Sequence, residues 1–156
     1  MHTIHLPSTQ CYRPSEVYIY VNRPLFNTMV FLNCSRDVDY TLRTIIAVDR
    51  LDYKEFFWVL LLSRANALLG FSEIGSGDDT GVVVNHKEIF QLILRINATN
   101  FIVAHNHPSG KLKPSASDIQ QTKRIVGFAD LLGVSLLDHL ILTSEGYLSF
   151  ADEGLL

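Results

Sequence analysis

Two histidines and one aspartate have the types and the spacing of a metal site. His105 and His107 are separated by one residue and follow directly after the apolar run 101–104. In an extended segment, residues at i and i+2 point to the same side, so both imidazoles can reach one ion. The loop after His107 is long enough to bring the carboxylate of Asp118 to the same point. Two neutral imidazoles and one carboxylate leave a fourth tetrahedral position for water, as a catalytic zinc site requires.

Each half of this pattern also has an ordinary structural explanation. A His-x-His pair alone is weak support for metal, because most surface histidines have no special role. Ser115 and Asp118 form the sequence of a capping box, in which the serine caps a helix and the acid lies in its first turn. The two interpretations are compatible, because a cap that fixes the helix start also orients Asp118. Together the two halves favour a metal site.

The combined pattern resembles the JAMM (MPN+) metalloprotease motif. That motif has a distant glutamate, then His-x-His, seven residues and Ser-x-x-Asp, and residues 108–114 provide the seven here. Three longer strings resemble the RadC family specifically: His-Asn-His-Pro-Ser-Gly-Lys-Leu-Lys-Pro-Ser at 105–115, Leu-Asp-His-Leu-Ile at 137–141, and Gly-Tyr-Leu-Ser-Phe-Ala-Asp-Glu-Gly at 146–154. The resemblance extends from about residue 35 to the last residue.

The resemblance implies a zinc-dependent metallopeptidase that hydrolyses a peptide or isopeptide bond. The zinc ligands would be His105, His107 and Asp118, and Ser115 would donate a hydrogen bond to the oxyanion of the tetrahedral intermediate. The remote glutamate would be the general base. We assign it to Glu55, fifty residues ahead of His105, because family members carry it just before the first long core strand.

Other assignments remain open at this stage. Glu73, at the end of the next predicted strand, is the rival base, and Glu88 on a predicted helix is a further candidate. Without the motif, Glu55 would be an exposed charge at a strand start. Asp138 and His139 are expected to form a buried hydrogen-bonded pair, and the alternative is that they support a metal ligand.

Apolar patterns predict the elements that would position these residues. Ser35 is the expected N-cap of a first helix, since apolar residues follow it at helical spacing. Strands are predicted at 56–63, 67–73, 82–84, 101–104, 134–142 and 147–150, and further helices at 86–98 and 115–132. These elements predict one α/β domain of α+β character, and the resemblance makes it a single MPN-type domain with a central mixed sheet flanked by helices. We expect residues 1–34 to form an extended arm, with one strand near 17–21, and residues 35–156 to form the domain.

Composition limits the class of protein. The 156 residues are 47% hydrophobic and 19% charged, which suits one packed core. The net charge of −3 argues against a nucleic-acid binder held by bulk charge. The partner that the resemblance implies is a peptide or protein substrate. A DNA-repair-associated role, which the RadC label suggests, and a non-catalytic MPN interaction module are the alternative functions.

The sequence also indicates where the protein resides. No positively charged start followed by an apolar stretch is present, so we expect no signal peptide. The longest apolar runs are too short to span a bilayer. Cys11 and Cys34 form no CxxC pattern, and a core of this size needs no disulfide. We therefore expect a soluble cytoplasmic protein, of open oligomeric state.

Overall fold

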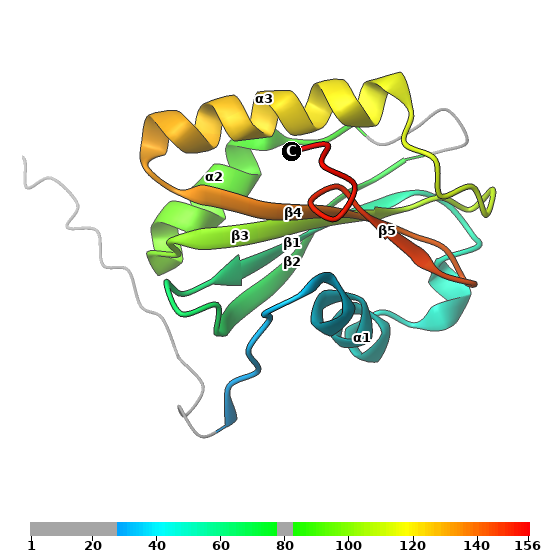
Figure 1. Ribbon diagram of the computed structural model, residues 1–156, viewed down its shortest axis with the longest axis horizontal. Helices are drawn as coiled ribbons and strands as arrows, with labels where there is room; N and C mark the ends of the chain where they lie inside the picture. The colour runs from blue at the N-terminus through cyan, green and yellow to red at the C-terminus, as the bar shows by residue number, and fades with distance from the viewer. Residues whose placement is uncertain (1–27, 78–82) are drawn as a thin grey trace, which may run out of the picture.

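The computed structural model describes residues 28–77 and 83–156. In this part of the chain, a five-stranded sheet of order β2-β1-β3-β4-β5 lies between two layers of helix (Figure 1). The strands are β1 (Phe56–Leu62), β2 (Leu68–Ser76), β3 (Asn100–Asn106), β4 (Ser135–Leu142) and β5 (Tyr147–Ser149). The helices are α1 (Ser35–Ile45), α2 (His86–Ile96) and α3 (Ala116–Leu132), with a 3-10 helix at Val48–Arg50.

The sheet is mixed, which confirms the predicted α/β architecture. β3 and β4 are parallel neighbours connected by α3, and the other neighbouring strands pair antiparallel. β1 lies between β2 and β3, and all seven of its residues are buried, as expected for a central strand covered on both faces. Its start pairs with the carboxyl end of β3, where Phe57 lies opposite His105.

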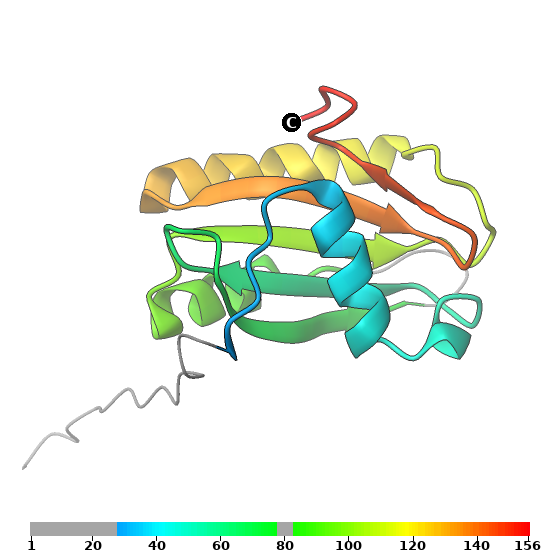
Figure 2. The same ribbon diagram turned by 60° about the horizontal axis from the view of Figure 1, so that its bottom comes forward.

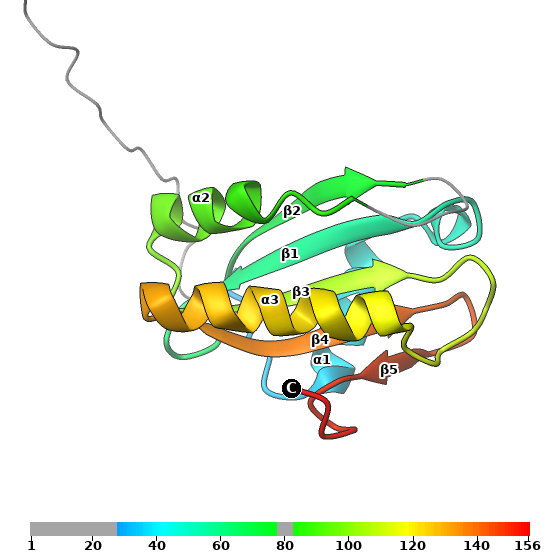
Figure 3. The ribbon, with the colours of Figure 1, turned by 90° about the horizontal axis from the view of Figure 1, so that it is seen from above.

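Alternation along the strands divides the core into two layers. Figure 2 shows α1 crossing one face of the sheet, and Figure 3 shows α2 and α3 side by side over the other. The α1 layer includes Trp58, Leu60, Val38 and Leu42. The α2 and α3 layer includes Phe57, Val59, Ile89 and Ile125. Neighbouring residues of a strand therefore point to opposite faces of the sheet, so polar side chains can meet only if they lie on the same face.

Short sequence signals set the ends of α2 and α3. The Ser115 hydroxyl accepts the Asp118 backbone N–H at 3.1 Å, and the Asp118 carboxylate accepts the Ser115 N–H at 2.7 Å. This is the predicted capping box at the start of α3. Gly133 ends the helix in the left-handed conformation with φ of 66°. Asn85 caps α2, which ends at a left-handed Asn97.

The start of α1 differs from the prediction. Cys34, not Ser35, occupies the N-cap position, and its side chain makes no capping hydrogen bond. Ser35 is the first helical residue, and its hydroxyl donates instead to the carboxylate of Asp152 at 2.6 Å. A serine hydroxyl can form its hydrogen bond with a distant residue as well as with the start of a helix. Sequence spacing does not distinguish these two possibilities.

Two strands are longer than their apolar runs, and one predicted strand is missing. β2 continues to Ser76 because it keeps pairing with β1, and β3 continues to Asn106 because it keeps pairing with β4. Val83 and Val84 form no strand and lead directly into α2. Position 82 lies outside the described residues, as do 78–81 of the predicted loop.

The chain ahead of α1 already contacts the domain. Phe31 forms an isolated bridge with Ala67, and Leu32 is buried in the α1 layer. Residues 1–27, including Cys11 and the strand expected at 17–21, lie outside the described residues, so the division at residue 34 stays a prediction. Across the described ranges, no helix is both long and apolar enough to cross a membrane.

Candidate metal centre

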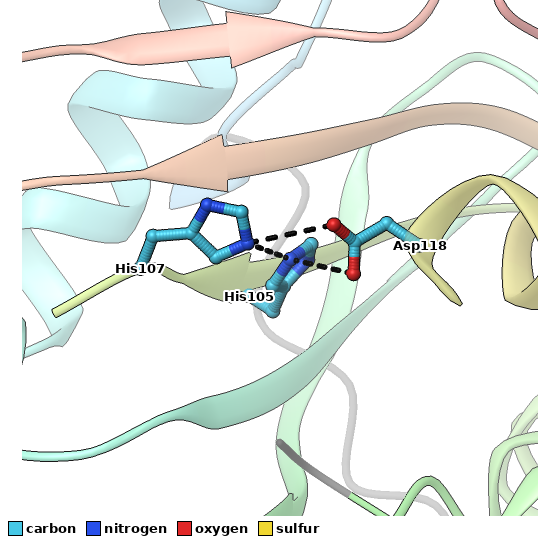
Figure 4. A group of neighbouring side chains, drawn as sticks. All are labelled: His105, His107 and Asp118. Atoms are coloured by element: carbon cyan, nitrogen blue, oxygen red, sulfur yellow. Dashed lines mark hydrogen bonds and ion pairs between the residues drawn. The ribbon is translucent and has the colours of Figure 1, made fainter. Parts of the chain in front are cut away.

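His105, His107 and Asp118 converge where β3 ends and α3 begins (Figure 4). The Nε2 atoms of the two histidines are 3.0 Å apart. The carboxylate oxygens of Asp118 lie 3.4 Å from Nε2 of His105 and 3.5 Å from Nε2 of His107. One ligand atom from each residue lies within 4.8 Å of the others, so the three side chains could hold one metal ion. Imidazole nitrogens with a carboxylate oxygen are a donor set typical of divalent transition metals.

The local fold explains why these three side chains meet. Strand alternation sends His105 and His107 to the same side of β3. After the intervening loop, α3 returns over that side of the sheet, as Figure 3 shows. The capping box with Ser115 fixes the first turn of α3 and holds the Asp118 carboxylate through one of its oxygens. The ligand set is therefore built at a single strand-to-helix junction.

Two of the three side chains are buried, and the Asp118 carboxylate is charged. His105 is 4% exposed and Asp118 9%. Burial raises the pKa of Asp118, but the imidazoles of His105 and His107 outweigh this, so the pKa lies well below its usual range. Asp118 raises the pKa of His107 against the effect of desolvation, and the Lys111 carbonyl adds to the increase. A charged carboxylate with imidazoles beside it is what a cation site needs.

The ring nitrogens that face away from the cluster also have partners. Nδ1 of His107 lies 2.6 Å from the Lys111 carbonyl oxygen. Nδ1 of His105 lies 2.8 Å from Nε2 of His139, and Nδ1 of His139 lies 2.7 Å from Oγ1 of Thr122. Hydrogen bonds of this kind orient the histidines of metal sites.

Asp138 and His139 form the predicted buried hydrogen-bonded pair, through the side chain of Asp138 and the backbone of His139. The Asp138 carboxylate accepts the backbone N–H of His139 at 2.7 Å and the hydroxyl of Ser149 at 2.6 Å. The imidazole of His139 instead contacts His105. The structure therefore confirms the buried hydrogen-bonded pair, and the His139 imidazole also contacts a residue of the cluster, in line with the alternative interpretation.

Glu55 lies beside the cluster, directly before β1. It is half-buried. The antiparallel register pairs Phe57 with His105, so Glu55, two residues before Phe57, lies at the edge of the sheet from which His105 and His107 leave β3. The charge of Glu55 contributes to the raised pKa of His107. A carboxylate in this position can exchange a proton with a group bound at the cluster.

The two rival glutamates are elsewhere. Glu73 lies opposite Trp58, in the α1 layer and thus on the other face of the sheet from His105. Its carboxylate forms an ion pair with Arg50 at 2.8 Å. Glu88 lies in the first turn of α2, where its backbone N–H is capped by a side chain.

Asn106, between the two histidines, has a structural role that the sequence analysis did not assign. It is fully buried, and alternation turns it away from the cluster. Its side-chain oxygen accepts the Phe56 N–H at 2.7 Å, and its amide nitrogen donates to the carbonyls of Leu51 and Lys54, each at 2.8 Å. Asn106 therefore ties the segment that carries Glu55 to the strand that carries the histidines. The sequence contained one indication of this role: a polar residue between two candidate ligands on a strand must point to the opposite face, where it needs buried hydrogen-bond partners.

The chain is similar to known proteins over most of its length. The model of the RadC-like JAB domain family matches residues 32–155. A UPF0758 protein of Flavobacterium johnsoniae is 44% identical over 101 residues, which cover 65% of this chain and 44% of that protein. A UPF0758 protein of Desulforamulus reducens is 34% identical over 130 residues, 83% of this chain and 56% of that protein. The chain thus spans about half the length of these curated relatives, whose names state no activity.

Proposed function

Because the chain belongs to the RadC-like JAB domain family, as its motifs predicted, we propose that it is a zinc-dependent metallopeptidase that hydrolyses a peptide or isopeptide bond. The observation that carries the proposal is the cluster of two imidazole nitrogens 3.0 Å apart beside a charged, buried carboxylate. We further propose that its partner is a peptide or protein of the cytoplasm.

The zinc ligands in this proposal are Nε2 of His105, Nε2 of His107 and the Asp118 carboxylate. They fit zinc because they combine imidazole nitrogen with carboxylate oxygen and number three, as in catalytic rather than structural zinc sites. Zinc bound there would polarise the scissile carbonyl and lower the pKa of a bound water to about 7.

Glu55 is the proposed general base. Its carboxylate accepts the proton of the attacking water and later delivers it to the leaving amine. Two observations support this role over Glu73: Glu55 lies two residues before Phe57, which pairs with His105, and its charge acts on the imidazole of His107. The Glu73 carboxylate is engaged with Arg50 on the opposite face.

Ser115 is the proposed oxyanion donor. In the capping box its oxygen accepts the backbone N–H of Asp118, which leaves the hydroxyl hydrogen free to donate elsewhere. Ser115 is exposed at the start of α3, three residues from a proposed ligand. Removing one oxyanion donor typically lowers kcat by about 10²–10³-fold. We expect a loss of this order for Ser115→Ala.

Metal analysis combined with peptide cleavage tests the proposal. The purified protein should contain zinc, and His107→Ala should lose it. Glu55→Gln should keep zinc but no longer cleave peptides of a mass-spectrometric substrate library. Glu73→Gln is the matched control and should retain both properties, because that carboxylate lies on the other face of the sheet.

The same experiment separates the alternatives. A protein without bound zinc, or with unchanged zinc in His107→Ala, would refute the proposal. Cleavage by Glu55→Gln at the wild-type rate would refute the assignment of the base. Full zinc content with no cleavage would favour a non-catalytic module, and salt-dependent DNA binding would favour the repair-associated role.

A further inference from the structure

We propose that Thr122 and His139 are positioning residues that hold His105 in the tautomer whose Nε2 is free to bind a metal ion. The inference rests on the proposed zinc site. The three residues form a buried chain of hydrogen bonds that runs from α3 through β4 to β3. The contacts of these three side chains determine which ring nitrogens carry a hydrogen.

The direction of the chain is set at Thr122. Its Oγ1 lies 2.7 Å from the backbone carbonyl oxygen of Asp118, which can only accept a hydrogen bond. The single hydroxyl hydrogen of Thr122 is therefore used for that bond. Oγ1 also lies 2.7 Å from Nδ1 of His139, and there the oxygen must accept. Nδ1 of His139 consequently carries a hydrogen.

The other ring nitrogen of His139 keeps its lone pair. His139 has no exposed surface and lies against the rings of Phe57 and Phe150, with centroids 5.8 Å and 4.6 Å away. Such surroundings disfavour a charged imidazolium. The nearby Asp138 carboxylate is engaged with Ser149 and with backbone N–H groups. His139 is therefore neutral, and its Nε2 is an acceptor.

His105 then has a single consistent tautomer. Its Nδ1 lies 2.8 Å from Nε2 of His139, and two lone pairs would repel at that distance. Nδ1 of His105 must therefore carry the hydrogen and donate it. The lone pair of His105 is left on Nε2, the atom that lies 3.0 Å from Nε2 of His107 and 3.4 Å from the Asp118 carboxylate. In the metal-free protein the hydrogen of the 3.0 Å contact is then on Nε2 of His107.

The two histidines of the cluster are oriented by different means. His107 donates from Nδ1 to the backbone carbonyl of Lys111, a group that no side-chain substitution removes. His105 depends on the side chains of His139 and Thr122. The Thr122 hydroxyl is bound in turn to the backbone of Asp118 itself, so one hydrogen-bonded chain links two of the three proposed ligands. Substitutions in this chain should therefore affect His105 and leave His107 unchanged.

Thr122→Val and Thr122→Ser, made in the full chain, form a matched pair for the test. Nitrogen-15 NMR of the metal-free protein distinguishes protonated from unprotonated imidazole nitrogens. In the wild type and in Thr122→Ser, His105 should be protonated at Nδ1. In Thr122→Val, His139 loses its acceptor and protonates at Nε2 instead, which moves the hydrogen of His105 to its own Nε2. Zinc affinity should then fall by about 10–100-fold, and Thr122→Ser should remain near the wild-type value.

His139→Leu is a second variant that removes the acceptor of His105 directly, and it should show the same loss of zinc affinity. A wild-type His105 protonated at Nε2 would overturn the inference. So would Thr122→Val, shown to be folded by its unfolding curve, with the wild-type tautomer and affinity. Because NMR reads the metal-free protein, the expected tautomer in a chain that binds no zinc would support this inference while refuting the proposed function.

Discussion

Replacing Asn106 by alanine tests how the segment ahead of β1 is held. The wild-type amide makes three buried hydrogen bonds of 2.7–2.8 Å, with the Phe56 N–H and with the carbonyls of Leu51 and Lys54. Each is worth about 0.5–1.5 kcal/mol net, so their combined loss should lower the free energy of unfolding by about 2–4 kcal/mol. Urea denaturation measures this change directly.

Asn106→Ala should also separate metal binding from catalysis. The amide makes no contact with the cluster, so zinc content should be unchanged. Cleavage should fall because the segment that carries Glu55 is released from β3. Asn100→Ala is the matched control: its amide bonds to Asn66 at the other end of the same strand, so it should cost stability but not cleavage.

Two results would contradict this reasoning. An Asn106→Ala protein as stable as the wild type would show that the three hydrogen bonds contribute nothing net. A destabilised protein that cleaves peptides at the wild-type rate would show that the position of Glu55 does not depend on Asn106, or that Glu55 is not the base.

Three further predictions concern stability, each measured by urea denaturation. Zinc at about 100 times its Kd should raise the free energy of unfolding by about 2.7 kcal/mol, and a chelator should reverse the gain. In the metal-free protein the raised pKa of His107 adds to the free energy of unfolding below about pH 6.5, and this contribution is lost as pH rises through the pKa of the folded state. His107→Ala should therefore lower the free energy of unfolding more near about pH 6 than near about pH 9. Gly127 lies exposed within α3 and Gly133 is left-handed, and a Cβ at either would meet nothing within 4 Å. Gly127→Ala should therefore stabilise by about 0.5–1 kcal/mol, and Gly133→Ala should destabilise by about 1 kcal/mol.

The sequence predicted the features that depend on interactions between residues close together in the chain. The His-x-His pair and the Ser115 capping box lie within one strand-to-helix junction, where alternation and helix capping act over a few residues. The helices and most strands follow from apolar spacing for the same reason. Ser35 is the exception, since its hydroxyl is bound by Asp152 from the far end of the chain.

Features that depend on strand pairing could not be read from the sequence. Glu55 directly precedes β1, whereas Glu73 lies within β2, where the register with Trp58 puts it on the other face of the sheet from His105. A bulge between Phe57 and Trp58 makes counting along the chain unreliable for β2. The contact of His139 with His105 likewise needs the parallel pairing of β3 with β4, which only a long crossover can create.

The alternation of His105, Asn106 and His107 has a consequence for refolding. If β3 slipped by one residue against β1, every side chain would change faces: the Asn106 amide would point towards α3, and both imidazoles would enter the apolar layer beneath α1. An ion that binds only the correctly paired sheet lowers the free energy of that sheet alone. If the cluster binds a metal ion as proposed, metal supplied while the chain refolds would therefore favour the correct register of β3 over a slipped one.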